Sequence, residues 1–217
     1  MNIFREISRS ITPHMRSSGF VLSGKSYYRI VNDVAYCIGF DMPGGLLYVT
    51  AYIMPLYIPC ESKYYTYGNR LNAIQNIKLP VLNKSDDETA INTWCRMLRE
   101  HIDRHIFPFF EEVGSPQKLM AYVDSHTRAL SEYVACHDVY IWRLKLYTYL
   151  FTGDYAKASR AIACYRKMLS NVTFLSGLVV RKYSAEIDEV ELIIQKEKAI
   201  AVEYCSGIIS NTKILLQ

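Results

Sequence analysis

The hydrophobic pattern of the first quarter of the chain predicts one helix followed by three strands. Apolar residues recur at helical spacing near the start: Phe4, Ile7, Ile11 and Met15. This spacing predicts an amphipathic helix over about residues 2–17. Pro13 should kink or shorten that helix, because proline has no backbone N–H to donate. Gly19 should end it, since glycine readily adopts the left-handed conformation found at many helix ends.

The next segment has the pattern of β-strands. Strand-favouring residues fill 25–31, and the Asn-Asp pair at 32–33 can form a two-residue hairpin turn. Over 34–42 large side chains alternate with small ones, so one face of this strand is bulky and the other is smooth. The Pro-Gly-Gly at 43–45 predicts a second turn before a third strand over 46–57. Strands joined by such short turns form an antiparallel sheet, with the first helix on one of its faces.

The remainder of the chain has mostly helical periodicity. Residues 59–88 are an exception, since they predict a long loop or a loop with an edge strand. Helices are then expected over these ranges: 88–112, 117–123, 127–151, 155–169 and 183–205. The predicted fold class is therefore α+β, with a three- or four-stranded antiparallel sheet packed by helices and a helical C-terminal part. We place a domain boundary near Ser125, between an α+β domain at 1–125 and a helical region at 126–217 that could pack on it as one unit.

Short motifs in the first part of the chain match a known pattern. They are a Gly-Phe pair, an aromatic-Arg pair, a strand aromatic, a Gly-x-Arg-Leu stretch and a Pro-Phe near a helix end: Gly19-Phe20, Tyr28-Arg29, Phe40, Gly68-Asn69-Arg70-Leu71 and Pro108-Phe109-Phe110. In these positions the chain resembles a family of bacterial domains of unknown function over roughly residues 1–125. The resemblance implies a fold and no particular reaction. Some members of that family lie beside bacterial defence or toxin-immunity genes, which implies an immunity-like or regulatory role.

A second resemblance concerns one turn in the helical part. Gly153-Asp154-Tyr155, followed by Ala158 and Ile162, is similar to the turn and second helix of a tetratricopeptide repeat. No second copy follows at the repeat period, and a solenoid needs several copies. We therefore expect an ordinary helical hairpin at this position.

Charge and cysteine content narrow the functional classes. The chain has 25 Lys+Arg against 21 Asp+Glu, and these charges are scattered, so the small excess favours neither nucleic-acid nor membrane binding. The six cysteines are widely spaced, with no C-x-x-C, and the first residues lack the apolar core of a signal peptide. We expect reduced thiols in a cytoplasmic protein. No uncharged apolar stretch reaches membrane-spanning length, so no membrane association is expected.

The sequence offers few groups arranged for catalysis. His101 and His105 are four residues apart on a predicted helix, a spacing that can place two imidazoles on a metal, with His126 or His137 as a third ligand only if folding brings it close. His105 falls in an apolar stripe, where a half-buried, hydrogen-bonded histidine is the simpler interpretation. Motifs for a nucleophile elbow, a phosphate loop or a dinucleotide fold are absent from the sequence. We therefore assign no catalytic, cofactor-binding or metal-binding residue, and favour a non-enzymatic protein without a cofactor.

Eighteen tyrosines are the unusual feature of the composition. Tyrosine combines a large contact area with a polar tip, and interfaces favour Tyr and Arg at their centres. We predict a partner-binding surface from six residues: Tyr28, Arg29, Tyr64, Tyr65, Tyr67 and Arg70. The alternative for each of them is internal packing.

The sequence thus predicts a protein-binding module, immunity-like or regulatory, whose partner is another protein. One alternative is a small enzyme or ligand-binding protein with a pocket between the sheet and the helix at 88–112. A second is a binder of single-stranded nucleic acid that stacks bases on sheet tyrosines. A deep pocket with convergent polar side chains would favour the first alternative, whereas an exposed aromatic patch would favour protein binding.

Overall fold

The sheet is built from antiparallel strands that pair in the order of the chain. The computed structural model describes residues 3–61, 66–125, 132–196 and 198–216. Within them the strands are β1 (Val21–Ser23), β2 (Ser26–Val31), β3 (Val34–Asp41), β4 (Leu46–Pro55), β5 (Tyr67–Arg70) and β6 (Leu82–Asn83). Each strand from β1 to β4 pairs with the next, and β6 pairs with the start of β4. The predicted α+β class with an antiparallel sheet is confirmed. The sheet has more strands than the three or four predicted. The prediction fell short because β1, β5 and β6 are too short to leave a pattern in the sequence.

The turns of the sheet adopt the conformations that their residue types allow. Asn32 and Asp33 both have positive φ, 47° and 63°, as a tight hairpin between β2 and β3 requires. Between β3 and β4 the chain makes a short 3-10 turn over Pro43–Gly45, in which both glycines have positive φ. Both turns predicted from the sequence are therefore present, and they fix the register that places Tyr36 opposite Arg29.

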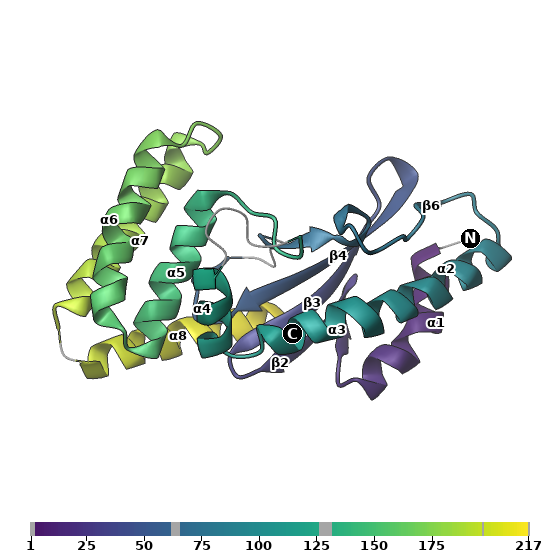
Figure 1. Ribbon diagram of the computed structural model, residues 1–217, viewed down its shortest axis with the longest axis horizontal. Helices are drawn as coiled ribbons and strands as arrows, with labels where there is room; N and C mark the ends of the chain where they lie inside the picture. Colours follow the sequence, from purple (N-terminus) through teal and green to yellow (C-terminus); the bar gives the residue numbers. More distant parts are fainter. Residues whose placement is uncertain (1–2, 62–65, 126–131, 197, 217) are drawn as a thin grey trace.

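The alternation along β3 decides which helix covers which face of the sheet. The bulky side chains, among them Tyr36 and Ile38, belong to the main core that includes α1 (Ile3–Ser17). The small ones, Ala35 and Cys37, face the opposite side and pack with Leu216 near the end of α8 (Lys198–Leu216). The first helix therefore lies on the bulky face, and small side chains let the last helix approach the other (Figure 1).

Pro13 was expected to kink or shorten the first helix. Helix α1 continues through Pro13 to Ser17, so the shortening was wrong. Pro13 is exposed, and the carbonyl of Arg9 that loses its donor lies on the same outer side, where water can hydrate it. The inward residues of α1 are those that the spacing predicted, with Ile7, Ile11 and Met15 fully buried. Gly19 follows with φ of 80°.

The helix predicted over 88–112 is one path made of three segments. These are α2 (Glu88–His101), a π-helical turn η3 (Ile102–Ile106) and α3 (Phe107–Glu112). The Phe107 N–H donates to the carbonyl of Ile102, five residues back. Pro108 accounts for this turn, because in a regular α-helix its ring would meet the carbonyl four residues earlier, and the wider π turn moves that carbonyl away. The ring of Phe110 then stacks on Tyr36 of the sheet, with 4.8 Å between ring centroids.

Two of the later helices have other limits than the sequence predicted. The described helices are α4 (Pro116–Ser125), α5 (Asp138–Thr152), α6 (Tyr155–Asn171), α7 (Gly177–Ile194) and α8. The helix expected from 127 begins instead at Asp138, where the His137 side chain accepts from the Val139 N–H as a cap; residues 126–131 lie outside the described part. The helix expected over 183–205 is divided between α7 and α8 by a turn that contains no glycine or proline to announce it.

Helices α5 and α6 form the predicted helical hairpin. Gly153 has φ of 78° and ends α5, and Asp154 caps α6 by accepting from the Lys157 N–H. Ala158 is completely buried, which lets the two helices pack closely. None of the described helices combines the length and the apolar character needed to cross a bilayer.

One connected apolar core joins the α+β part to the helical part. It extends from Ile3 on α1 to Cys205 on α8. Tyr57, just after β4, shows the connection in detail: its ring stacks on Phe151 of α5 at 4.5 Å, and its hydroxyl lies 3.1 Å from the Thr148 hydroxyl. The helical region therefore packs against the sheet region as a continuation of the same core.

Candidate functional site

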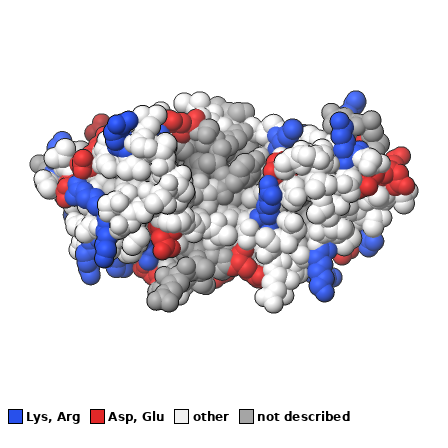
Figure 2. Space-filling view, turned by 90° about the horizontal axis from the view of Figure 1, so that it is seen from above, with Lys and Arg blue, Asp and Glu red and all other residues white. Residues whose placement is uncertain are grey.

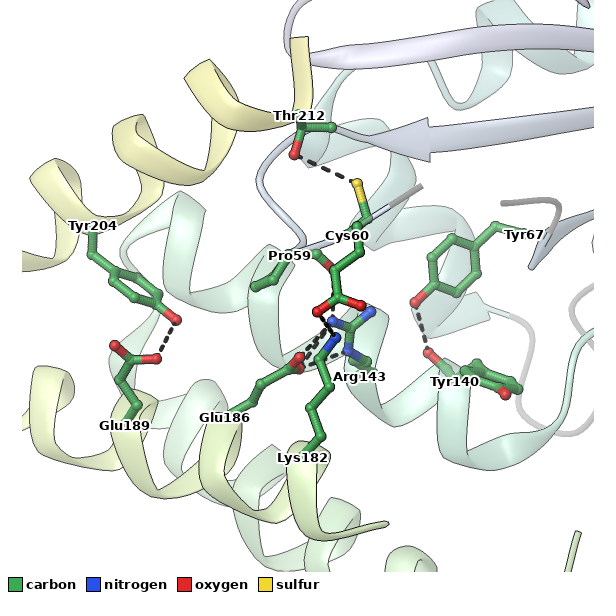
Figure 3. Close-up of polar contacts among 11 residues, drawn as sticks. Pro59, Cys60, Tyr67, Tyr140, Arg143, Lys182, Glu186, Glu189, Tyr204 and Thr212 are labelled. Atoms are coloured by element: carbon green, nitrogen blue, oxygen red, sulfur yellow. Dashed lines mark hydrogen bonds and ion pairs between the residues drawn. The ribbon is translucent and has the colours of Figure 1, made fainter. Parts of the chain in front are cut away.

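Arg143 on α5 is a charged residue buried between helices, with only 5% of its surface exposed. Arginine is almost never fully buried unless it is paired. Its Nε and Nη2 donate to the two carboxylate oxygens of Glu186 on α7, at 3.0 and 3.1 Å. Nη2 also donates to the Pro59 carbonyl at 2.7 Å. One guanidinium thus connects α5, α7 and the segment that follows β4 (Figure 3).

Helical spacing places tyrosine rings around this ion pair. Residues three and four apart share a helix face, so Tyr140 and Tyr147 lie on either side of Arg143 on α5, and Tyr183 precedes Glu186 by one turn on α7. The guanidinium carbon lies 4.9 Å from the Tyr183 ring centroid and 5.6 Å from that of Tyr147. The pair is therefore enclosed by aromatic surface, which attracts a cation through the ring faces.

Sequence reasoning missed this pair. The available signal was Arg143, a single charge on a helix face that is otherwise apolar and aromatic. Neither residue was given a role from the sequence, although a buried charge requires an opposite charge to pair with.

The ionisable groups of this cluster are held in their uncharged or paired forms. Burial raises the pKa of Glu186, although the neighbouring Arg143 lowers it. Burial likewise raises the pKa of the phenols of Tyr140 and Tyr183, and that of Tyr147 lies well above the ordinary value. Neutral phenols and one compensated ion pair favour hydrogen bonding and packing over proton transfer near neutral pH.

A cleft of about 180 Å³ lies beside the Arg143–Glu186 pair. It is lined by Pro59, Cys60, Glu61, Thr66, Tyr140, Arg143, Lys182 and Tyr183. Lys182 Nζ lies 2.8 Å from Glu61 Oε1 and joins α7 to the loop at the edge of the cleft. The thiol of Cys60 donates to the Thr212 hydroxyl at 3.7 Å, and burial raises the pKa of this thiol. Because of its size the cleft can accept a single side chain or a similarly small group.

Exposed apolar side chains lie next to residues that line this cleft. The Phe174 ring packs on His137 at 4.5 Å and on Tyr140 at 6.3 Å, yet 52% of Phe174 remains exposed. Leu178 is 71% exposed and precedes Lys182 by one turn on the same side of α7. We call this area the cleft surface, and define it by five residues: Tyr140, Phe174, Leu178, Lys182 and Tyr183.

The structure does not bring the predicted partner residues onto one surface. Tyr67 is fully buried, and its hydroxyl donates to the Tyr140 carbonyl at 3.2 Å, so the prediction that it is a surface contact was wrong. Neighbouring strand residues point to opposite faces: Arg29 contacts the α1 and α3 side, with 2.7 Å to Glu111, whereas Tyr28 packs on the smaller core under α8. The loop is nevertheless close to the cleft, since Thr66 lines it.

Arg70 is exposed but engaged within the sheet. Its guanidinium carbon lies 4.1 Å from the Tyr48 ring centroid, and Nη2 lies 3.0 Å from Asp41 Oδ2. Tyr64 and Tyr65 lie outside the described residues. The described members of the predicted surface therefore lie in different places. Tyr67 is buried, Tyr28 and Arg29 lie on opposite faces of β2, and Arg70 lies at the end of β5.

The two histidines predicted to be adjacent are adjacent, with 5.8 Å between the ring centroids of His101 and His105, and both are half-buried. Among the described ranges, no group of three His, Cys, Asp or Glu side chains is arranged to hold a metal ion. His137 serves as the cap of α5, and His126 is outside the described residues.

The tyrosines of the sheet are largely internal. Tyr27, Tyr36 and Tyr52 are each at most 1% exposed, so these three rings cannot stack unpaired bases. On the face seen in Figure 2, basic and acidic side chains are interspersed at both ends of the molecule. This distribution agrees with the scattered charge of the sequence.

Comparisons with known proteins returned no match: no family model fits the sequence, and neither a curated protein nor a solved structure is significantly similar to it.

Proposed function

We propose that the protein is a non-enzymatic module that binds another protein through the cleft surface. The supporting observation is the exposure of Phe174 and Leu178 beside a small cleft that the buried Arg143–Glu186 pair helps to form. Interfaces are enriched in aromatic residues, and their energetic centres are side chains that fill well-packed pockets. An apolar side chain of the partner would enter the cleft, while Phe174 and Leu178 would be covered around it.

The ordering of the site supports binding. The buried Arg143–Glu186 pair orders one wall of the cleft before any partner arrives, and the exposed Lys182–Glu61 pair spans its edge. A preformed surface loses less side-chain freedom on association than a mobile one, so more of the contact energy appears as affinity. The raised pKa of the tyrosines around Arg143 favours this role over acid–base catalysis.

The test compares the wild type, one double-serine variant and one single-serine control in quantitative affinity capture from a lysate of the source organism. F174S/L178S removes the exposed apolar groups of the cleft surface. V202S is the matched control, because Val202 on α8 is 65% exposed and lies outside the cleft surface. A protein retained by the wild type and by V202S, and lost with F174S/L178S, supports the proposal. Equal retention by all three forms, or no retained protein, contradicts it.

A further inference from the structure

A second cavity, separate from the cleft surface, lies where the turns of the sheet meet the start of α1. Its volume is about 400 Å³, which is within the range of sites for small ligands. The side chains that form its body are apolar, with Phe4 from α1, Phe40 from β3 and Leu47 from β4. Phe40 and Leu47 are at most 4% exposed, and the Phe4 and Phe40 rings meet edge to face at 5.9 Å. The cavity therefore has rigid aromatic and aliphatic walls.

Two lysines stand at this cavity with no salt-bridge partner among the described residues. Lys25 and Lys84 both line it, and both are exposed. Their backbones are fixed by hydrogen bonds, from the Phe40 N–H to the Lys25 carbonyl and from the Lys84 N–H to the Gly45 carbonyl, each at 3.0 Å. Two lysines thus line a largely apolar space, each from a backbone position fixed by a hydrogen bond.

Two further features add to the positive potential here. The first turn of α1 also lines the cavity through Ile3, and the N-terminal end of a helix carries partial positive charge. The cavity has one carboxylate, Asp41, which is paired with Arg70 at 3.0 Å. An anion between the lysines would therefore meet a net positive surrounding.

We propose that this cavity binds a medium-chain fatty carboxylate, with the chain among Phe4, Phe40 and Leu47 and the carboxylate between Lys25 and Lys84. The apolar walls recognise the chain through burial, and the lysines select an anionic head over a neutral or cationic one. This site is independent of the proposed protein binding.

The probe is decanoate, titrated by calorimetry below its micelle concentration. Saturable binding is expected, and octanoate should bind roughly tenfold more weakly, since two fewer methylenes are buried. K25Q and K84Q should each weaken decanoate binding about two- to fivefold, as for exposed ion pairs, while decanol binding stays unchanged. K78Q is the matched control, because Lys78 is exposed and lies away from the cavity lining.

A blocking variant locates the ligand. Met42 is half-exposed at the same cavity, so M42W should fill part of it and weaken decanoate binding without unfolding the protein, as circular dichroism can verify. A titration without saturation overturns the proposal. It is also overturned if K25Q/K84Q binds decanoate as K78Q does, or if folded M42W binds it as the wild type does.

Discussion

Replacing Arg143 with methionine removes its hydrogen bonds to Glu186 and to the Pro59 carbonyl, and leaves the Glu186 carboxylate without its guanidinium partner. Both side chains are nearly buried, with 6% and 11% exposed. Removing one partner of a buried ion pair typically costs about 3–5 kcal/mol, because the remaining charge stays out of water. We therefore expect R143M to lower the free energy of unfolding by about that amount.

The double variant R143M/E186L separates the ion pair from simple packing. With both charges replaced by apolar groups, the Pro59 carbonyl is the acceptor that loses its donor, at a cost of about 1–3 kcal/mol. The double variant should therefore be more stable than R143M by about 2 kcal/mol. Urea unfolding followed by tryptophan fluorescence measures this, since Trp142 adjoins Arg143 on α5 and Trp94 reports on α2.

The pH dependence of R143M gives an independent check. The pKa of Glu186 is already raised by burial in the folded wild type, and Arg143 opposes that rise. A carboxyl with a raised folded pKa stabilises the fold below its unfolded pKa, about 4.3, and that stabilisation is lost as pH rises through the folded value. Without Arg143 the loss at neutral pH grows, so the gap between wild type and R143M should narrow on acidification to about pH 4.5. A gap below about 1 kcal/mol at neutral pH, or a double variant no more stable than R143M, would refute the reasoning.

Three further predictions concern other parts of the chain. G68A should lower the free energy of unfolding by about 1–3 kcal/mol, measured by thermal unfolding, because an added Cβ would overlap the Ala51 carbonyl. G207A, which has open space on α8, should raise it by about 0.5–1 kcal/mol. An unchanged stability of G68A would contradict the β4–β5 register. Burial is the chief cause that raises the pKa of Tyr36 to about 12. The free energy of unfolding should therefore fall as pH rises above about 10, in step with an ultraviolet tyrosine titration. A free energy of unfolding that does not change up to about pH 12 would argue against this. Burial also raises the pKa of the Cys136 thiol to about 12. This thiol should therefore be alkylated more than a hundredfold more slowly than free cysteine at about pH 8, as peptide mass spectrometry can measure. Labelling at the rate of free cysteine would show that the thiol is not buried.

Features with a strong local signal were predictable from the sequence. The period-two alternation of residues 34–41 has one packing solution, because its bulky and smooth faces need different neighbours. The Asn-Asp and Pro-Gly-Gly turns depend on conformations that few other residue types adopt. These local signals established the α+β class and the central strands.

Other features depend on contacts between distant segments. Strands β5 and β6 form by pairing with β4, and each has too few residues to show a period in the sequence. The π-helical turn before Pro108 keeps the helical path continuous, so that Phe110 can pack against the sheet. The divided helix after Ile194 has no glycine or proline to mark its end.

The candidate site was the least predictable part. Tyr67 looks like an exposed loop residue in the sequence, but it is buried because β5 pairs with β4 and directs its ring into the core. Arg143 and Glu186 are separated by 43 residues in sequence, and only the packing of α5 against α7 brings their charges together.

The central claim is that the cleft surface contacts a partner protein, and site-specific photo-crosslinking in the source organism tests it most directly. A photoreactive phenylalanine analogue replaces Leu178 in one form and Val202 in another, since both positions are exposed on helices. We predict that the analogue at position 178 forms a covalent adduct with one defined protein, and that the analogue at position 202 does not. The same adducts at both positions, or none at 178, would contradict the account.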